Sequence, residues 1–188
     1  MNFAHIIKQP SNGKRFALKA KQRGFTMVEL GLALLIIAVL GLAALSAYSS
    51  NNTSSQSKAL AEDMTTLMAK VKQSYAGNYA AVTNAKLSTG SFFINLATLK
   101  DVAGVVGITP GSGTLTVSSG TVAVAGDSVQ YVLTNIPDAA CLPLTTSLAK
   151  NATKLLMGAN VVKAVGGVPD FSKNSCAGDA NTMTIVYM

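Results

Sequence analysis

An apolar run from Leu30 to Leu45, directly preceded by a single carboxylate at Glu29, constrains this chain more than any other feature. As a helix, the stretch from Phe25 to Leu45 would rise about 31 Å. That length matches the roughly 30 Å hydrocarbon core of a bilayer. A lone charge near the head of such a segment is costly and usually serves a purpose. We therefore expect residues 25–48 to form a membrane-spanning helix in which Glu29 has a specific role.

Residues 1–24 form a basic, polar leader that precedes this run. It holds six of the fifteen basic residues and no acid, whereas the rest of the chain carries nine Lys against eight acidic residues. The basic residues of the leader are Lys8, Lys14, Arg15, Lys19, Lys21 and Arg23. Such a cluster beside an apolar run indicates a positive-inside topology signal and contact with an anionic membrane surface. Because no aromatic platform accompanies the charges, we expect no nucleic-acid partner.

The segment from 49 to 188 is expected to be the globular head. Residues 49–57 contain only Ser, Asn, Thr and Gln, which are poor helix formers. They form either a flexible break or a helix held by tertiary contacts. Residues 58–76 have helical periodicity, with one apolar stripe that is expected to face the core. The members of the stripe are Leu60, Met64, Leu67, Met68, Val71 and Tyr75.

Residues 77–188 have the pattern of a small sheet with short helices. We expect a connection over 77–90, then a helix over 91–99 with Ser91 as its N-cap. Gly and Pro then punctuate three runs of β-branched residues that predict consecutive antiparallel strands. These runs are 114–118, 121–125 and 129–134. A further helix is expected within 144–158, and residues 182–188 are expected to add a strand to the same sheet. The fold class is therefore α+β.

Two cysteines, Cys141 and Cys176, have no CxxC spacing and no neighbouring His. In an exported domain, a single disulfide is the default interpretation. Closing a loop of about 36 residues would stabilise the fold by roughly 4 kcal/mol on the chain-entropy model. Two unpaired buried thiols are the alternative.

The leader also presents a processing site. Gly24 offers the small residue that a protease needs at the bond that it cuts, and Lys21 and Arg23 would hold this bond near the cytoplasmic face. After cleavage, the free amine of Phe25 would lie close to Glu29, because residues four apart share a helix face. In a low dielectric an ammonium compensates a carboxylate. In an assembly, Glu29 of one subunit could reach the Phe25 amine of a neighbour and set the register.

The stretch Arg23-Gly24-Phe25-Thr26-Met27-Val28-Glu29-Leu30 with its apolar run resembles the prepilin signature of type IV pilins. The resemblance implies cleavage between Gly24 and Phe25 by a prepilin peptidase, N-methylation of Phe25, and a role of Glu29 in subunit recruitment. It also implies a pilin fold, in which a long N-terminal helix packs on an antiparallel sheet. The cysteine pair would then resemble the disulfide-bounded region near the C-terminus of pilins.

Within that family, the 24-residue leader and the stretch Tyr75-Ala-Gly-Asn-Tyr79 resemble the type IVb group, which includes conjugative thin pili and toxin-coregulated and bundle-forming pili. Two residues depart from the patterns of the subclasses. Phe25 stands where type IVb pilins often have Met, Leu or Val, and Ser46 stands where type IVa pilins have a helix-breaking Pro.

The resemblance implies a structural subunit of a Gram-negative bacterium. It would be anchored in the inner membrane as a precursor and then polymerised into a surface filament for adhesion, cell-cell contact or conjugation. Its partners would be further copies of itself, prepilin peptidase, the inner-membrane assembly machinery, minor pilins and, before assembly, the membrane. An apolar helix of this length predicts polymerisation, and non-closing head-to-tail contacts give a helical filament.

Other classes fit the sequence less well. A pseudopilin of a type II secretion system shares the same N-terminus. A secreted binding domain would instead be cut near Ala44-Leu45-Ser46 by a signal peptidase, and a single-span anchored protein would not be cut. No enzymatic activity, cofactor or metal is expected. The only His is His5 in the leader, and the acids Asp101, Asp127, Asp138, Asp170 and Asp179 are expected to cap or turn the chain.

Overall fold

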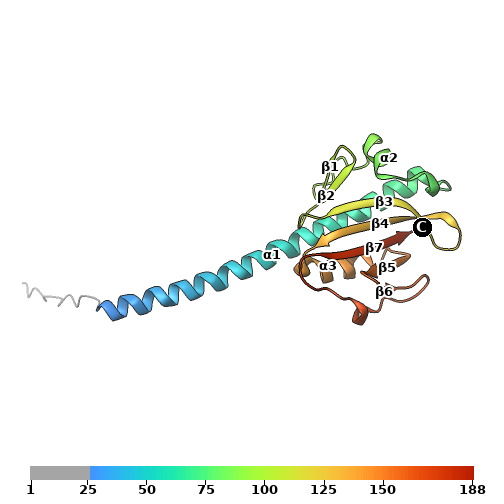
Figure 1. The fold of residues 1–188 in the computed structure, drawn as a ribbon. Helices are drawn as coiled ribbons and strands as arrows, with labels where there is room; N and C mark the ends of the chain where they lie inside the picture. The colour runs from blue at the N-terminus through green and yellow to red at the C-terminus, as the bar shows by residue number, and fades with distance from the viewer. Residues whose placement is uncertain (1–25) are drawn as a thin grey trace, which may run out of the picture. The chain divides into compact units, whose positions relative to one another are not determined.

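The computed structural model describes residues 26–188, which divide into two compact units. The first unit ends at Leu42, and the second comprises Ala43–Met188. Helix α1 (Met27–Tyr75) contributes residues to both units (Figure 1). The polar residues 49–57 are helical, so of the two alternatives for this segment, a flexible break or a helix held by tertiary contacts, the structure has the helix. Ser57 is fully buried and donates its hydroxyl to the carbonyl oxygen of Thr53 at 2.6 Å, which indicates that tertiary packing holds this poor helix former.

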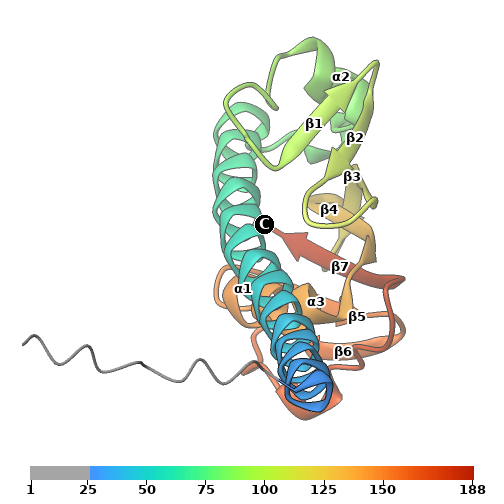
Figure 2. The ribbon, with the colours of Figure 1, turned by 90° about the vertical axis from the view of Figure 1, so that its left-hand side faces the viewer.

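The second unit is built around the apolar stripe of α1, and the prediction for this stripe is confirmed. Leu60, Met64, Leu67, Met68 and Val71 are buried, and Tyr75 packs against the same core. In Figures 1 and 2, this part of α1 lies along one face of the sheet. The residues that complete the core from the sheet are Val117, Tyr131, Leu133, Leu155, Met157, Met183 and Ile185.

A seven-stranded antiparallel sheet confirms the α+β class. Its strands are β1 (Leu99–Val102), β2 (Val105–Ile108), β3 (Thr114–Thr121), β4 (Ala125–Ile136), β5 (Lys154–Met157), β6 (Asn160–Lys163) and β7 (Asn181–Tyr187). The spatial order is β1-β2-β3-β4-β7-β5-β6. The expected C-terminal strand is therefore present, and it lies in the interior of the sheet between β4 and β5.

The expected strand over 121–125 is wrong, because most of this stretch is the turn between β3 and β4. Asp127 stabilises that turn with both carboxylate oxygens. Oδ1 accepts the N–H of Val122 at 2.8 Å, and Oδ2 accepts those of Ala123 and Val124 at 2.7 and 2.8 Å. These backbone donors, Val124 first, lower the pKa of Asp127 to about 2. The carboxylate thus holds Val122–Val124 in a bend, although the sequence of this apolar run is typical of a strand.

The segment before β1 also differs from the expectation. The expected connection over 77–90 contains a short 3-10 helix, η1 (Tyr79–Ala81), and helix α2 (Asn84–Thr89), whereas residues 91–99 form no helix. Thr83 caps α2, because its hydroxyl accepts the N–H of Lys86 at 3.3 Å. Ser91 cannot be the N-cap of a helix here, because its φ is +61°, in the left-handed region.

Two α1 side chains hold this segment against the helix. Asp63 accepts the backbone N–H of Thr98 at 2.8 Å and the Thr98 hydroxyl at 2.6 Å. Lys70 Nζ donates to the carbonyl oxygens of Phe92 and Ile94 at 3.4 and 3.3 Å. Carbonyl and N–H groups of an irregular segment thereby find partners, as partly buried backbone requires.

The helix expected within 144–158 lies earlier, as α3 (Asp138–Leu148), and residues 154–157 are strand β5. Pro143 inside α3 lacks an N–H and weakens the helical signal in the sequence. The β5 residues pair with β7, so sheet contacts override the helical propensity of Lys-Leu-Leu-Met. A second 3-10 helix, η2 (Phe171–Lys173), precedes Cys176.

Candidate processing and assembly site

The N-terminus of α1 is capped by reciprocal hydrogen bonds between Thr26 and Glu29. The Thr26 hydroxyl oxygen accepts the backbone N–H of Glu29 at 3.2 Å. In return, Glu29 Oε2 accepts both the backbone N–H and the hydroxyl of Thr26, each at 3.0 Å. This arrangement is a capping box, which satisfies N–H groups that have no partner within a helix. The Thr-x-x-Glu spacing was the sequence signal for it, and Thr26 is a site residue that the sequence interpretation did not single out.

The second oxygen of this carboxylate, Oε1, has no donor among the described residues. Within residues 26–188, Glu29 Oε1 accepts no hydrogen bond, and the Glu29 side chain is exposed. The predicted cleavage point Gly24 and the predicted methylation point Phe25 lie outside the described residues. Cleavage, methylation and a contact between Glu29 and a Phe25 amine therefore stay predictions. The capping box leaves one carboxylate oxygen for a further donor.

Beyond the capping box, α1 presents an exposed apolar surface. Met27–Leu45 has a mean hydropathy of 2.6, and none of this stretch is buried. Its nineteen residues rise about 28 Å as a helix, close to the roughly 30 Å core of a bilayer. This length and composition suit a membrane span, and a signal sequence near an N-terminus passes the same test.

Gly31 and Gly41 lie within this exposed stretch. Apart from the neighbouring residues and the nearby backbone of α1 itself, no described atom lies within 4 Å of the position that a Cβ would occupy at either residue. Intrachain packing therefore does not require glycine at these two positions. Small residues on a membrane helix permit the close approach of a second helix, so packing against another helix stays a prediction for these two glycines.

Cys141 and Cys176 form the expected disulfide. Cys141 is fully buried in α3, and Cys176 follows η2. Asn174 connects the two sides of the bridge: its Nδ2 donates to Cys176 Sγ at 3.2 Å, and its Oδ1 accepts the Thr145 hydroxyl at 3.3 Å. The bridge thereby joins α3 to the irregular segment that precedes β7.

Among residues 26–188, no group of three or more His, Cys, Asp or Glu side chains has the placement of a metal site. The acids expected to turn the chain do so at Asp101, Asp127 and Asp170, each of which accepts a backbone N–H of a nearby residue. Asp138 and Asp179 make no such contact within the described residues. Three of these five acids therefore hold loops or turns of the head.

Comparison with known proteins places these features in context. Residues 19–45 match the prokaryotic N-terminal methylation motif. Among solved structures, the chain is similar to the type IVb pilin from Salmonella typhi, with 14% identity and a TM-score of 0.50, over 73% of this chain and 98% of that one. It is also similar to TcpA, a type IV pilin from Vibrio cholerae El Tor biotype, with 14% identity and a TM-score of 0.54, over 71% and 99% of the two chains. No curated protein sequence matches it.

Proposed function

We propose that this chain, a type IV pilin-like protein with a prepilin N-methylation motif and a type IVb-like pilin fold, is a structural subunit of a type IV pilus. The single observation that carries the proposal is the methylation motif over 19–45 continuing into the exposed apolar stretch Met27–Leu45 of α1. An apolar surface of that length needs either lipid or other copies of the same helix around it.

The proposed sequence of events begins in the inner membrane of a Gram-negative bacterium. Residues 1–24 direct topology and are removed by a prepilin peptidase between Gly24 and Phe25, and Phe25 is then N-methylated. Residues 25–48 anchor the subunit and later form the filament core, while residues 49–188 form the head. The assembly machinery and minor pilins move the subunit into a surface filament that serves adhesion, cell-cell contact or conjugation.

Glu29 is the proposed register residue of the filament. Oε2 already accepts two hydrogen bonds from Thr26, and Oε1, which has no donor within residues 26–188, would accept one from a neighbouring subunit. A methylated ammonium at Phe25 of that neighbour would supply the charge that offsets a carboxylate in an apolar surrounding. The capping box supports this role because it fixes the position of the carboxylate before the neighbour arrives.

The test is mass spectrometry of the N-terminus of the exported protein, combined with electron microscopy of sheared surface fibres. An N-methylated Phe25 terminus and fibres built of this chain are expected. A terminus near Ala47 would show an ordinary signal peptide and overturn the proposal. Correct processing without surface fibres at native expression would instead fit a pseudopilin.

The variant Glu29→Val should be processed normally between Gly24 and Phe25 and yet give at least a tenfold lower yield of fibres. Glu62→Val is the matched control, because Glu62 is an exposed α1 carboxylate within the head. Wild-type fibre yield from Glu29→Val would count against the register role and leave the processing result standing.

A further inference from the structure

A pair of exposed valines marks one edge of the sheet. Val102 and Val105 are register partners at the end of the β1–β2 hairpin, and they are 71% and 61% exposed. Lys100 lies on the same face as Val102, because side chains two apart along a strand point the same way. Its register partner is Gly107, which has no side chain to cover it. We call Lys100, Val102 and Val105 the valine knob.

A concave surface of complementary character lies in the disulfide region. A hollow of about 650 Å³ is lined by Asp138 and Leu142 from α3 and by Phe171 from η2, with further lining from Ser54, Ala139, Pro143, Asn174 and Cys176. Leu142 and Phe171 are 51% and 42% exposed. We call Asp138, Leu142 and Phe171 the acidic hollow. The lining is mixed: Leu142 and Phe171 supply apolar surface for the two valines, and Asp138, the single carboxylate of the lining, matches the single ammonium of the knob.

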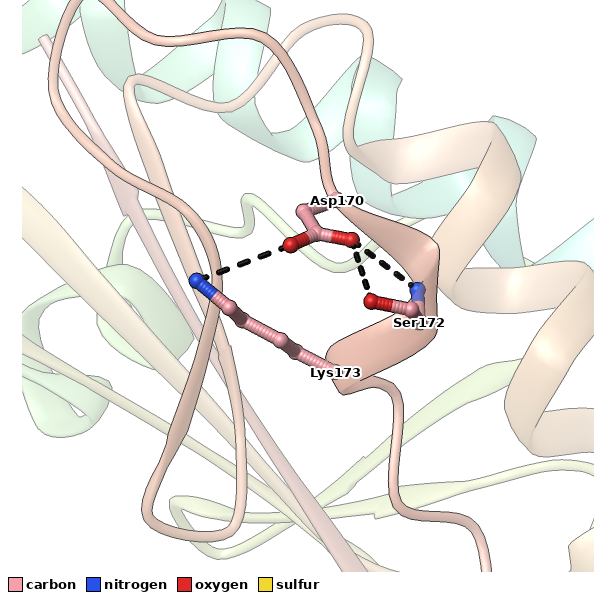
Figure 3. Close-up of polar contacts among 3 residues, drawn as sticks. All are labelled: Asp170, Ser172 and Lys173. Atoms are coloured by element: carbon pink, nitrogen blue, oxygen red, sulfur yellow. Dashed lines mark hydrogen bonds and ion pairs between the residues drawn. The ribbon is translucent and has the colours of Figure 1, made fainter.

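Both surfaces are held in shape by local polar contacts. Figure 3 shows Asp170 accepting the N–H and hydroxyl of Ser172, at 3.2 and 2.6 Å, and pairing with Lys173 at 3.5 Å. These contacts fix the short helix that carries Phe171. At the other edge, Asp101 accepts the N–H of Gly104 at 3.0 Å and fixes the turn between the two valines. Pre-formed surfaces bind at a lower entropic cost.

The two charges have no partner within the described part of the chain. Neither the ammonium of Lys100 nor the carboxylate of Asp138 makes an ion pair or hydrogen bond within residues 26–188. By contrast, Asp63, Asp101, Asp127 and Asp170 all accept hydrogen bonds. Opposite charges that remain unpaired in the folded subunit, each next to exposed apolar side chains, are suited to pair across an interface.

The knob and the hollow lie toward opposite ends of the strand order. The knob belongs to β1 and β2, at one end of the sheet, while η2 of the hollow contacts β6, at the other end. A contact between two different surfaces is heterologous, and it extends into a helical array when the rotation does not close. We propose that the valine knob of one copy docks in the acidic hollow of a second copy, with Lys100 paired to Asp138. This proposal rests on the proposed function as a pilus subunit.

Charge reversal in the full chain, expressed in its assembly-competent host, tests the contact. Lys100→Glu and Asp138→Lys should each lower the yield of sheared fibres at least tenfold, and the double variant should regain at least half of the wild-type yield. Lys150→Glu and Asp179→Lys are the matched controls, since both are exposed charges without a partner in residues 26–188, and they should leave the yield unchanged. Single variants at wild-type yield, or a double variant no better than either single variant, would overturn the contact.

Cross-linking tests the same contact in otherwise wild-type protein, and it applies even if the charge-reversal variants do not fold or accumulate in cells. Benzoylphenylalanine at Val102 of otherwise wild-type protein, irradiated in intact fibres, should cross-link to the segments 138–143 or 171–176 of another copy. Cross-links confined to other segments would overturn the proposal. Absence of wild-type fibres would mean that the proposed function itself has failed, whereas fibres with the wrong cross-link would leave that function standing.

Discussion

The carboxylate of Asp63 on α1 accepts two hydrogen bonds from one residue, Thr98, through the backbone N–H at 2.8 Å and the hydroxyl at 2.6 Å. Thr98 directly precedes β1 and is 5% exposed. This contact connects the long helix to the first strand across a segment whose own backbone makes turns instead of regular structure. It also positions the hairpin that carries the valine knob.

Asp63→Ala should destabilise the head by about 1–3 kcal/mol, because the nearly buried N–H and hydroxyl of Thr98 lose their charged acceptor. Glu62→Ala, an exposed neighbour on the same helix, should cost less than about 0.5 kcal/mol. Urea unfolding of the full chain in detergent, followed by tyrosine fluorescence, measures both. Equal midpoints for the two variants would contradict the assigned role of Asp63.

The Asp127 carboxylate should make the stability of the head depend on pH through the β3–β4 turn. Its pKa in the folded protein is lowered from 3.8 to about 2 by the N–H groups of Val124, Ala123 and Val122. A lowered folded-state pKa contributes stability above the unfolded value, and this contribution disappears as the pH falls through the folded value. Wild type should therefore be more stable than Asp127→Asn at pH 6, and the difference should shrink between pH 4 and 2. A difference that stays constant across this range would contradict the assignment.

We expect removal of the disulfide at Cys176 to lower the stability of the head strongly. Cys176→Ser should lower the free energy of unfolding by roughly 4 kcal/mol, because the unfolded chain regains the freedom of a loop whose ends lie 35 residues apart. Wild type treated with dithiothreitol is the control and should unfold at the same urea concentration as the variant. Identical midpoints for oxidised wild type and Cys176→Ser would show that the bridge does not stabilise the head.

We expect the head to tolerate the loss of the Tyr131 hydroxyl without a loss of stability. Its ring is fully buried, and its hydroxyl is without a hydrogen-bond partner in the described chain. Burial raises the pKa of this phenol, so it stays neutral at any physiological pH. Tyr131→Phe should leave stability unchanged or raise it by up to about 1 kcal/mol, because the variant removes an unsatisfied buried group. Thermal unfolding compares it with Tyr79→Phe, and a loss above 1 kcal/mol at Tyr131 would reveal a partner for the hydroxyl.

The sequence predicted the features that depend on long, strong patterns. The apolar stretch of α1, its core stripe from Leu60 to Val71, and the strand ending the chain all follow from periodicity and hydropathy. The disulfide followed from two cysteines without metal-ligand spacing. The cleavage point at Gly24 and the methylation of Phe25 remain predictions, because those residues lie outside the part of the chain that the structure describes.

The errors occurred where a few side chains override local pattern. Three N–H groups on Asp127 turn Val122–Val124 into a bend, and Ser91 adopts a left-handed φ that no helix admits. Residues 154–157 become a strand because β7 offers a partner edge. The capping box could be recognised from the spacing of Thr26 and Glu29. The acidic hollow could not be found without the fold, because it joins residues of α3 and η2 that are distant in the sequence.

The interior place of β7 means that the sheet cannot be completed until the last strand of the chain is available. Strands β4 and β5 both precede β7 in the chain, yet each pairs with it and they do not pair with each other. If the head is exported as proposed, its sheet would consist of two separated pieces with open edges until residues 181–187 arrive, and open edges invite aggregation. In the proposed function, the apolar helix Met27–Leu45 would hold the subunit at the bilayer during this interval.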